Sequence, residues 1–500
     1  MPYSQKHPNP RVIVVGAGIG GLMTGLLLGK AGITYQIFER SSHVKALGAL
    51  MSINANILPV FEQLGLLEEV QNISLCNHWT SIYDHKMKQI GKVGMDDYKE
   101  RTGYDFLVFS RPELYDILLR NIPKDRISFN KRILTMRKCI DGTRIYCSDN
   151  SIYEGDIVIG ADGAYSSVRH NMHKMMEKDG IFPVKDTKEM AMPYLCMVGT
   201  TSPMDVEKYP QLKDTENHLH HVVGDSVYSW TVITIPRNRF CWSVMVQVKN
   251  QAAAKEQRFR NSDWGPEANN ELIEEVKDFP ITFGGTLGDM IAATPKGRIS
   301  KVMLEEKLFE TWHYNNVVLI GDACHKMLPT SGQGAMNAMQ DAVVLINCLY
   351  DLKDLSPESI TAAFENYKSQ RYSQAKKQVA YSKLNAKVSS GQTFLERAVR
   401  HLVLNYIPSS LKAKQFSKEA AYRPQVAFLP QISDRGSIKS LPNPPSKRAI
   451  YEEYVQRKRR AIAMYKSSDA SSSLSFASTE LGVATLTEDP YLTEKRYVSV

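Results

Sequence analysis

Three glycines and one acid near the start of the chain have the types and spacing that hold a dinucleotide. Gly16, Gly18 and Gly21 form the pattern G-x-G-x-x-G, and Glu39 follows the next apolar run. The first glycine permits a tight turn, the second lets a pyrophosphate approach the backbone, and the third lets a helix pack closely on a strand. A carboxylate at Glu39 would accept hydrogen bonds from ribose hydroxyls and repel a 2′-phosphate. The pattern therefore predicts bound FAD or NAD rather than NADP.

Two later segments carry residues suited to a flavin. The strand predicted at 156–160 is followed by Asp162, and the strand predicted at 316–320 is followed by Gly321-Asp322. A glycine and an acid at the end of a strand permit close approach and accept hydrogen bonds from polyol hydroxyls, such as those of a ribityl chain. Gly332-Gln333-Gly334 then opens a helix whose free N–H groups would stabilise negative charge on the pyrimidine edge of a reduced flavin. The three segments, taken in this order, favour FAD.

A strand, a helix and a second strand must position the first set of residues. Residues 12–15 are apolar and β-branched, as in a buried parallel strand. The helix predicted at 21–30 points its N-terminus at the phosphates, and the strand at 34–38 ends beside the acid. A signal peptide or a membrane helix is the alternative for the nearly uncharged run 12–29. Its glycines and the βαβ continuation argue against both.

Composition narrows the class of protein and its compartment. A chain of 500 residues can hold two or three domains, and a net charge of +9 without a basic–aromatic motif does not indicate a nucleic-acid partner. The seven cysteines are widely spaced, with no C-x-x-C pair and no histidine in metal spacing. We therefore expect no disulfide framework and no metal. The predicted location is cytoplasmic, with neither a signal peptide nor a transmembrane helix.

Periodicity divides the chain into segments of different structure. Strands and helices alternate up to about residue 170, whereas residues 228–235 and 240–248 have the period of two that is typical of antiparallel strands. The predicted fold class is α/β: a Rossmann-like FAD-binding domain with an inserted antiparallel substrate sheet and a helical C-terminal extension. The predicted parts are 1–170 (first FAD-binding part), 171–300 (inserted sheet), 301–375 (second FAD-binding part), 376–445 (helical) and 446–500 (basic, largely disordered).

The C-terminal region contains an amphipathic helix, predicted at 393–405. Its apolar face could pack on the body of the protein or touch a membrane surface, so peripheral membrane contact is one alternative. Residues 467–500 have the composition of a disordered segment. The basic run 457–460 suits a nuclear-import signal or a solvated helix end.

With these motifs, the chain resembles the single-component FAD-dependent monooxygenases related to para-hydroxybenzoate hydroxylase. The resemblance covers about residues 11–375 and rests on GAGIGG at 16–21, ADG at 161–163 and GDACHKMLPTSGQGAMNAMQDA at 321–342. Within the family, the chain is most similar to fungal epoxidases and hydroxylases of secondary metabolism. One departure is Ala55, where the family usually has proline. The resemblance implies that the cofactor-binding residues are Gly16, Gly18, Gly20, Gly21, Glu39, Arg40, Gly48, Arg111, Asp162, Asp322, Gly332, Gly334 and Ala335.

The resemblance also implies an activity. NADPH or NADH would reduce FAD, O₂ would form a C4a-hydroperoxyflavin, and this species would hydroxylate or epoxidise an aromatic or terpenoid small molecule. Tyr228 and Tyr194 are then candidate catalytic proton donors, although packing in a core is an alternative for both. Leu195 stands where such enzymes often have arginine. His325, in the third motif, is expected to orient the loop beneath the flavin.

Alternation along the two antiparallel strands predicts a lining for the substrate pocket. Trp242, Val244 and Val246 share one face of their strand, and Tyr228 shares a face of the neighbouring strand with Trp230 and Val232. This aromatic, apolar set would suit an aromatic or terpenoid substrate. A solid hydrophobic core is the alternative.

Three other functions are compatible with parts of these motifs. A halogenase would have Trp-x-Trp-x-Ile-Pro, but Thr231 and Ile233 occupy the tryptophan positions. A reductase or oxidase of the same fold needs the same cofactor motifs and differs only in lacking oxygen insertion. A non-catalytic binding scaffold, similar to dissociation inhibitors of prenylated GTPases, would bind no flavin.

Overall fold

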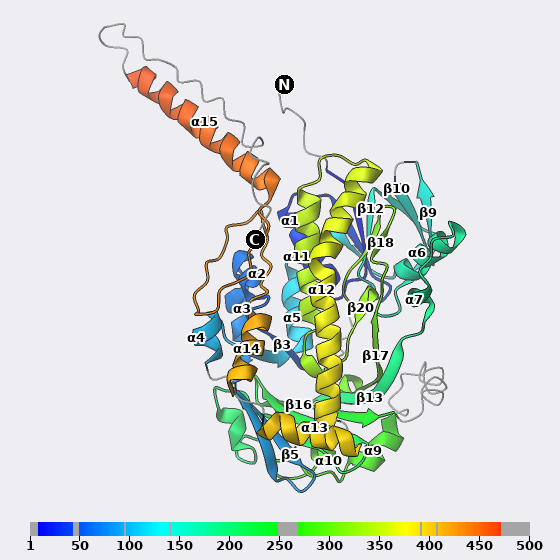
Figure 1. Cartoon of the computed structure of the whole chain (residues 1–500), viewed down its shortest axis with the longest axis vertical. Coiled ribbons are helices and arrows are strands. Elements are labelled where there is room, and N and C mark those ends of the chain that lie inside the picture. The colour runs from blue at the N-terminus through cyan, green and yellow to red at the C-terminus, as the bar shows by residue number, and fades with distance from the viewer. Residues whose placement is uncertain are drawn as a thin grey trace. The chain divides into compact units, whose positions relative to one another are not determined.

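A mostly parallel sheet built on the strand–glycine–helix unit, called the parallel sheet below, forms one half of the fold (Figure 1). The computed structural model describes residues 9–43, 50–94, 97–140, 142–248, 269–390, 393–406 and 409–471. β1 (Val12–Val15) lies in the sheet interior, and all four of its residues are buried, as expected for an interior strand of such a sheet. From edge to edge the strands are β18 (His313–Tyr314), β19 (Val317–Leu319), β12 (Ile157–Gly160), β1, β2 (Tyr35–Phe38) and β8 (Ile127–Ser128).

Four helices connect this sheet to the rest of the protein. α1 (Ile19–Lys30) follows the glycine turn and packs against both α5 (Arg111–Arg120) and α11 (Gly334–Tyr350). α12 (Pro357–Ser390) packs on α11 at one end and contacts strands of the second sheet further along. The predicted boundary at 375/376 therefore falls inside one continuous helix.

The second half is an eight-stranded sheet whose composition the sequence predicted only in part. β14 (Leu219–Val223) pairs in parallel with β5 (Trp79–Asp84), which comes from the first 100 residues. The sheet is thus mixed rather than wholly antiparallel, and it is not confined to 171–300. Its strands in spatial order are β20 (His325–Lys326), β17 (Ser300–Leu308), β13 (Ala191–Thr200), β16 (Arg239–Gln247), β15 (Tyr228–Ile235), β14, β5 and β6 (Gln89–Gly94).

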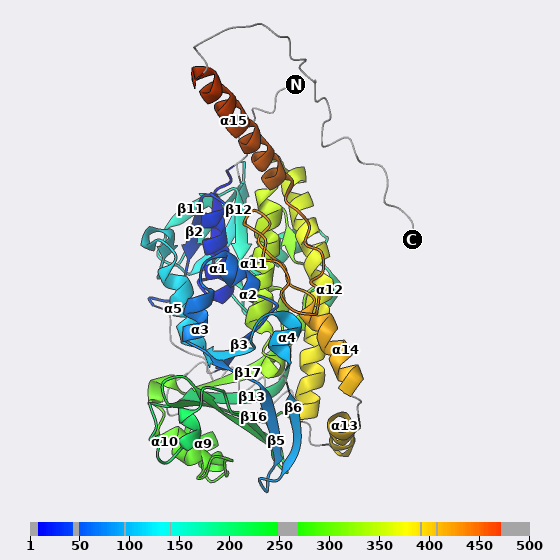
Figure 2. The ribbon, with the colours of Figure 1, turned by 90° about the vertical axis from the view of Figure 1, so that its left-hand side faces the viewer.

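The two faces of this sheet have different neighbours (Figure 2). α9 (Asn270–Val276) and α10 (Leu287–Ala292) cover the face directed away from the parallel sheet, where they form a hydrophobic core with the strands. The opposite face is directed toward the first half of the fold. This arrangement decides which strand residues can reach a bound molecule.

Smaller elements complete the part of the chain up to Ser446, which forms one compact unit. Two three-stranded sheets contain β3 (Leu50–Ile53), β7 (Leu107–Ser110) and β4 (Leu75–Cys76), and β11 (Ile152–Gly155), β10 (Gly142–Cys147) and β9 (Ile133–Cys139). The remaining helices are α2 (Leu58–Gln63), α3 (Leu67–Asn72), α4 (Tyr98–Thr102), α6 (Ser167–Lys178), α7 (Val184–Thr187), α13 (Phe394–Asn405) and α14 (Ser409–Ala420).

A second unit begins at Lys447. Residues Lys447–Ser471 form the helix α15, which contains the basic run 457–460 and extends into the first residues of the segment 467–500 that was predicted to be disordered. The rest of the tail lies outside the described residues. Among the helices that the structure describes, none is long and apolar enough to cross a membrane.

Candidate active site

A cleft of about 2970 Å³ lies between the parallel sheet and the eight-stranded sheet. Residues of the glycine turn, of the segment after β12, of the segment after β19 and of the eight-stranded sheet all line it. Pockets for a drug-sized molecule occupy about 300–1,000 Å³. This cleft therefore has room for a dinucleotide and a second molecule together.

Glycine is sterically required at two positions of the turn that lines the cleft, and a third glycine leaves open space beside it. Gly16 has φ +102°, and a Cβ there would lie 2.6 Å from the Ala161 carbonyl oxygen. A Cβ on Gly21 would lie 1.9 Å from the Gly16 carbonyl oxygen. Gly18 lines the cleft, and its missing Cβ would meet nothing within 4 Å. The free space beside Gly18, at the N-terminus of α1, is where a pyrophosphate fits.

Glu39 lies against this turn at the end of β2. Its carboxylate accepts hydrogen bonds from the backbone N–H groups of Ala17 and Ser41, each at 2.9 Å. Both bonds fix the carboxylate beside the turn, and the adjacent Arg40 is exposed and lines the cleft. Ribose contacts by Glu39 and an adenine position for Arg40 remain predictions. Gly48 lies outside the described residues.

Asp162 has a structural task that the sequence did not reveal. Its Oδ2 accepts hydrogen bonds from the backbone N–H groups of Ser167 (2.7 Å) and Val168 (3.1 Å), and so caps α6. Its Oδ1 is buried and has no partner among the described residues. The neighbouring Ala161 and Gly163 line the cleft, but Asp162 itself does not. A direct contact between Asp162 and the cofactor remains a prediction.

Asp322 lines the cleft and is paired with a lysine. Its Oδ2 lies 2.6 Å from Nζ of Lys326, which also lines the cleft. Burial alone would raise the pKa of Asp322, but Lys326, with smaller effects of His325 and Arg111, holds it below its ordinary value. Asp322 is therefore an anion at neutral pH and can accept hydrogen bonds from a polyol. Arg111, also predicted as a cofactor contact, lines the same cleft.

The predicted G-x-G segment forms the N-terminal end of α11 at the cleft. Gly332 has φ +64°, and a Cβ there would come within 2.7 Å of the Ser52 hydroxyl oxygen. Gly332, Gly334 and Ala335 all line the cleft, and the first turn of α11 contains no acid. The unpaired N–H groups of a 17-residue helix therefore point at the cleft without a competing negative charge.

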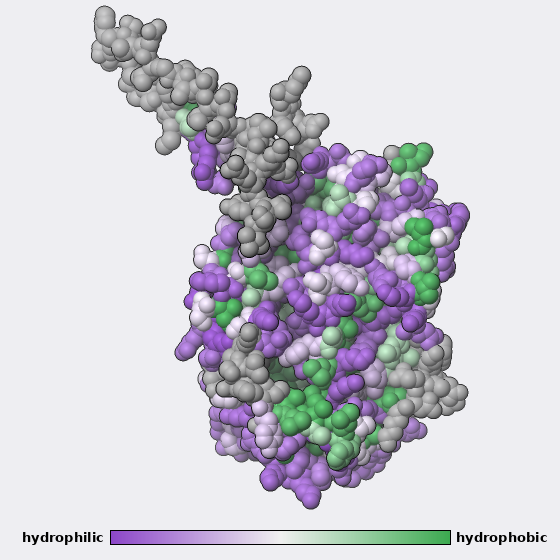
Figure 3. Space-filling view, in the orientation of Figure 1, coloured by the Kyte–Doolittle hydropathy of each residue, from purple (hydrophilic) through white to green (hydrophobic). Residues whose placement is uncertain are grey.

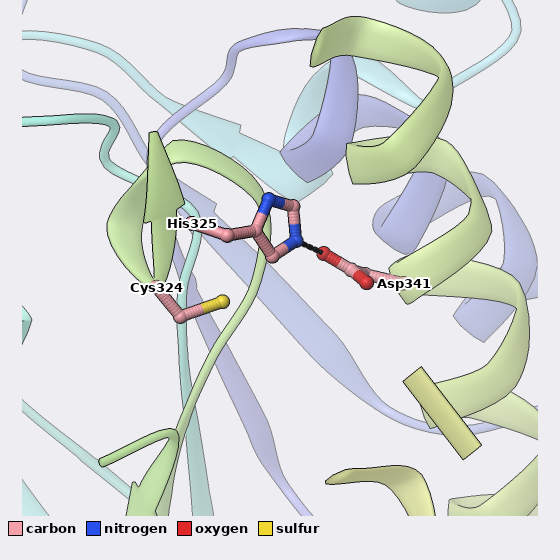
Figure 4. A group of neighbouring side chains, drawn as sticks. All are labelled: Cys324, His325 and Asp341. Carbon is pink, nitrogen blue, oxygen red and sulfur yellow. Dashed lines mark hydrogen bonds and ion pairs between the residues drawn. The ribbon is translucent and has the colours of Figure 1, made fainter. Parts of the chain in front are cut away.

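A buried hydrogen-bonded network supports the loop that follows β19, and it includes the pair of His325 and Asp341 (Figure 4). Asp341 of α11 accepts hydrogen bonds from His325 Nε2 (2.5 Å), Arg371 Nε (2.7 Å) and the backbone N–H of Gly321 (2.8 Å). The side chains of Asp341, His325 and Arg371 are fully buried. The network fixes the loop that carries Asp322, which is the structural role expected for His325.

Cys324 lies beside His325 and Asp341, so the three residues have the spacing of metal ligands. However, the Asp341 carboxylate already accepts three hydrogen bonds, and burial raises the pKa of the Cys324 thiol. The thiol lies 3.5 Å from the carbonyl oxygens of Leu319 and Gly321. These oxygens can only accept hydrogen bonds, so the sulfur carries the proton. A protonated thiol is a poor metal ligand. The cluster is therefore best explained as support for the loop.

The sheet face that closes the cleft differs from the predicted one. Trp230, Val232, Trp242 and Val244 form the core with α9 and α10, on the face away from the cleft. The other face lines the cleft instead, because alternate residues point to opposite sides. One row of paired residues crosses six strands of this face, and all of its members line the cleft: Ile82, His221, Thr231, Ser243, Val198 and Ser300.

Tyr228, predicted to be a proton donor near the substrate, is on the wrong face for that role. Its hydroxyl donates to Glu275 of α9 at 2.6 Å, and its ring packs against the core under α9. Burial and this hydrogen bond raise the pKa of Tyr228 to about 12. Leu195 also packs against that core.

Tyr194 is on the cleft side of the sheet but does not reach the cleft surface. It is 3% exposed and packs with Cys196, Leu304 and Leu328. Burial raises the pKa of Tyr194 to about 12. Its catalytic role stays a prediction.

His221 is a cleft residue that sequence reasoning missed. Its Nε2 lies 2.9 Å from the Ser389 carbonyl oxygen, and its Nδ1 lies 2.8 Å from the Thr231 hydroxyl oxygen. Because a carbonyl can only accept, Nε2 carries the proton and Nδ1 accepts from the threonine. Burial lowers the pKa of His221, so the ring is neutral. It joins the sheet to the end of α12.

Glu305 is the second missed residue, and it has an unusual environment. It is 3% exposed, lines the cleft, and its Oε1 has no hydrogen-bond partner among the described residues. Burial raises the pKa of Glu305 from 4.5 to about 7, with a further rise from Asp322 and an opposing effect from Lys326. Glu305, Asp322 and Lys326 meet only in the folded structure. The sequence of β17 alone gives no sign that the Glu305 carboxyl is buried beside them.

Glu305→Gln should change the pH dependence of stability. Below pH 4.5 the carboxyl is protonated in both the folded and the unfolded chain. Between pH 4.5 and about 7 only the unfolded chain ionises, so the folded wild type loses stability, reaching a loss of about 1–3 kcal/mol above that range. Glutamine cannot ionise and avoids this loss. Denaturant unfolding should thus show the variant gaining on the wild type between pH 4.5 and 8.

Glu306→Gln is the matched control for this prediction. Glu306 is the next residue of β17, and its Oε1 accepts a hydrogen bond from Lys383 at 2.8 Å. We expect this variant to lose its ion pair with Lys383 and therefore to gain no stability over the wild type. If the unfolding free energies of Glu305→Gln and the wild type differed by the same amount at pH 4.5 and at pH 8, the Glu305 carboxyl would ionise normally.

Comparison with known proteins explains why these segments meet at one cleft. A model of a family described as FAD binding domain matches residues 9–382. The chain belongs to this FAD-binding family. The glycine turn, the open space at Gly18 and the N-terminal end of α11 fit a bound FAD. A scaffold that binds no flavin is therefore not the function of this flavoprotein.

Curated relatives add the type of reaction. FAD-dependent monooxygenase ausM of Penicillium brasilianum is 28% identical over 432 residues, covering 84% of this chain and 87% of the relative. FAD-dependent monooxygenase atmM of Aspergillus flavus is 28% identical over 443 residues, covering 85% and 88%. With the family match, these relatives identify the flavoprotein as an FAD-dependent monooxygenase of the fungal secondary-metabolism type.

Solved structures confirm the predicted fold class. Klebsiella pneumoniae HpxO, complexed with FAD and uric acid, aligns with a TM-score of 0.67 at 21% identity, over 84% of this chain and 99% of that chain. CtdE, in complex with FAD and a substrate, aligns with a TM-score of 0.61 at 18% identity, over 82% and 98%. The flavoprotein thus has the α/β fold of FAD-bound enzymes.

Asp322→Ala should abolish stable retention of FAD by this flavoprotein. Hydrogen bonds to a charged acceptor contribute about 1.5–3 kcal/mol, so affinity should fall about tenfold or more. The measurement is the ratio of flavin to protein absorbance after gel filtration. Asp322→Asn is the control, because it keeps an acceptor oxygen and loses only the charge. Stoichiometric FAD in the alanine variant would remove the role assigned to this acid.

Proposed function

We propose that this flavoprotein uses NAD(P)H and O₂ to hydroxylate or epoxidise an apolar small molecule, either aromatic or terpenoid. One observation carries the proposal: a single cleft runs from the glycine turn and the α11 N-terminus to the inner face of the eight-stranded sheet. A cofactor held by the first two would lie beside a substrate held by the third. Bound FAD would supply the redox chemistry, taking electrons from the nicotinamide donor and reducing O₂.

The residues of the chain would bind, orient and exclude water. Gly18 leaves space for the pyrophosphate, and Asp322 offers an anionic acceptor to the ribityl hydroxyls. The α11 N-terminus directs positive partial charge at the place where electrons would accumulate, which lowers the cost of reduction. No second G-x-G-x-x-G follows a strand in the sequence, so the nicotinamide donor would bind transiently in the same cleft.

The inner sheet face favours a terpenoid over a flat aromatic substrate. Its apolar members are aliphatic or sulfur-containing side chains, among them Cys196, Val198, Met245 and Val302. The aromatic side chains Trp230 and Trp242 point away from the cleft into the core on the other face. They therefore cannot stack on a substrate in the cleft. The Ser243 hydroxyl lies in the same row and can donate a hydrogen bond to an oxygen substituent, whereas the Thr231 hydroxyl donates to His221 and can only accept one.

An anaerobic spectral titration tests the proposed reaction. NADPH and then NADH are added to the purified holoenzyme while the flavin absorbance is followed, with and without candidate terpenoids and aromatics. We expect bleaching that a true substrate accelerates, and recovery in air with one oxygen atom from ¹⁸O₂ in the product. Recovery that yields only hydrogen peroxide with every candidate would favour an oxidase. A product that requires chloride or bromide would favour a halogenase.

Ser243→Phe tests where the substrate lies. A phenyl ring at this position would project from β16 into the cleft, and we expect KM for the substrate to rise about tenfold, equivalent to about 1.4 kcal/mol. FAD content should not change, because Ser243 belongs to the sheet face and not to the glycine segments. Ser243→Ala is the control: it removes only the hydroxyl and adds no bulk, so KM should rise less than in the phenylalanine variant. Normal KM in the phenylalanine variant would place the substrate elsewhere in the cleft.

A further inference from the structure

Helix α13 turns its apolar face outward, whereas an ordinary surface helix turns that face toward the protein. A capping box of Thr393 and Glu396 begins it. The positions 395, 399, 402 and 406 lie on one side, and their side chains, Leu395, Val399, Leu402 and Tyr406, are 72%, 36%, 55% and 67% exposed. Arg400, on the other side, is only 8% exposed. The helix therefore buries an arginine and exposes its apolar stripe, whereas surface helices normally do the reverse.

The stripe belongs to a larger apolar surface (Figure 3). Phe394 at the start of α13 is 89% exposed, and Leu384 of α12 is also exposed. β6 lies against α13, and its Lys92 places Nζ 3.7 Å from the ring centroid of the exposed Trp79. Monomeric soluble proteins seldom expose large contiguous apolar patches, so such a surface indicates an interaction site.

This surface borders the mouth of the cleft. Val403 of α13, Leu384 and Val388 of α12, and Val93 of β6 all line the cleft. The same elements thus form the exposed apolar surface and the entrance to the site. An apolar molecule that leaves the surface needs to cross little water before it enters the cleft.

We propose that the α13 stripe (Phe394, Leu395, Val399, Leu402 and Tyr406) docks on a lipid bilayer that carries anionic headgroups, with the cleft mouth facing the bilayer. The stripe has aliphatic residues between Phe394 and Tyr406, and no acid lies at its outward positions. The acid of the first turn, Glu396, bonds back to the Thr393 backbone. Aliphatic and aromatic side chains on one helical face, with cationic neighbours, are typical of helices that lie in the membrane interface.

Charge favours lipid over a protein partner as the occupant. Lys92 and Arg397 flank the surface, and the chain has a net charge of +9. Basic side chains close to a bilayer surface are attracted by anionic lipid. The binding step stands apart from the proposed reaction. Only the entry of substrate from the bilayer rests on the proposed function.

Cosedimentation of the full-length holoenzyme with vesicles tests the proposal. The vesicles are pure phosphatidylcholine, or phosphatidylcholine with phosphatidylserine. We expect binding to the phosphatidylserine vesicles, and at least tenfold weaker binding for the double variant Leu395→Asp, Leu402→Asp. The matched control is Leu134→Asp on β9, since Leu134 is 56% exposed, nearly the same as Leu402. It should bind as the wild type does.

Several outcomes would overturn the proposal. These are no binding to either vesicle, equal binding to both vesicle types, or unchanged binding by the double variant, which would assign the attraction to other basic parts of the chain. A wild type that is dimeric in gel filtration, with a monomeric double variant that keeps its vesicle binding, would identify the stripe as a contact between two copies. FAD content and flavin reduction by NAD(P)H, measured without vesicles, report on the proposed function separately.

Discussion

Asp341→Ala is expected to destabilise the protein by about 3–5 kcal/mol and to release FAD from the fraction that folds. The carboxylate is fully buried and balances the Arg371 guanidinium and the His325 ring on opposite oxygens. Its removal leaves a buried cation without a counter-ion and Gly321 N–H without its acceptor. Chemical denaturation and flavin content after gel filtration measure the two effects.

Asp322→Ala separates loss of cofactor from loss of stability. This acid lies one residue after Gly321, but its side chain is 33% exposed and faces the cleft. We expect it to lose FAD as the Asp341 variant does, while its unfolding free energy without FAD changes much less. If both apoproteins unfold at the same denaturant concentration, the network beneath the loop contributes nothing beyond holding the cofactor.

Gly21→Ala is expected to prevent folding of the first βαβ unit. The added Cβ would lie 1.9 Å from the Gly16 carbonyl oxygen, a backbone atom that cannot move without displacing β1 and α1. We expect a loss of at least about 3 kcal/mol, as for severe overpacking in a core. Little soluble, folded protein should be recovered.

Gly18→Ala is the matched partner within the same motif. Its Cβ would meet nothing within 4 Å of protein, and its backbone is extended at φ −71°. The variant should fold with the thermal stability of the wild-type apoprotein and bind FAD at least about tenfold more weakly, since the methyl group occupies the pyrophosphate position. Equal behaviour of the two alanine variants would contradict the different tasks assigned to the two glycines.

The elements that line the cofactor half of the cleft could be predicted from the sequence because their signals are local. The strand at 12–15, the glycine turn and the acid that follows are close together in the chain, and each requirement is steric or electrostatic within a few residues. The same holds for Asp322 and for Gly332 at the start of α11. The buried partner Asp341 lay inside a quoted motif, but its ion pair with Arg371 spans 30 residues and carried no signal.

The substrate half could not be predicted to the same depth. Alternation sorts the residues of β15 and β16 into two faces, but it does not say which face meets the cofactor. Tyr228 was therefore placed on the cleft side, although α9 covers that face. The contribution of β5 depends on pairing with β14 over more than 130 residues of sequence, which local patterns do not record. Glu305 and His221 depend on contacts of the same long range.

Helix α12 limits how the enzyme can be divided or recombined. Its 34 residues span about 51 Å at 1.5 Å per residue. Arg371, near the middle of the helix, holds Asp341, while Ser389 and Ser390 at its C-terminal end are bonded to His221 and Ser229 of the sheet. A chimaera that exchanges only the sheet between two relatives would separate these partners. The unit of exchange must include the distal turns of α12, so substrate range and the end of this helix are expected to have diversified together.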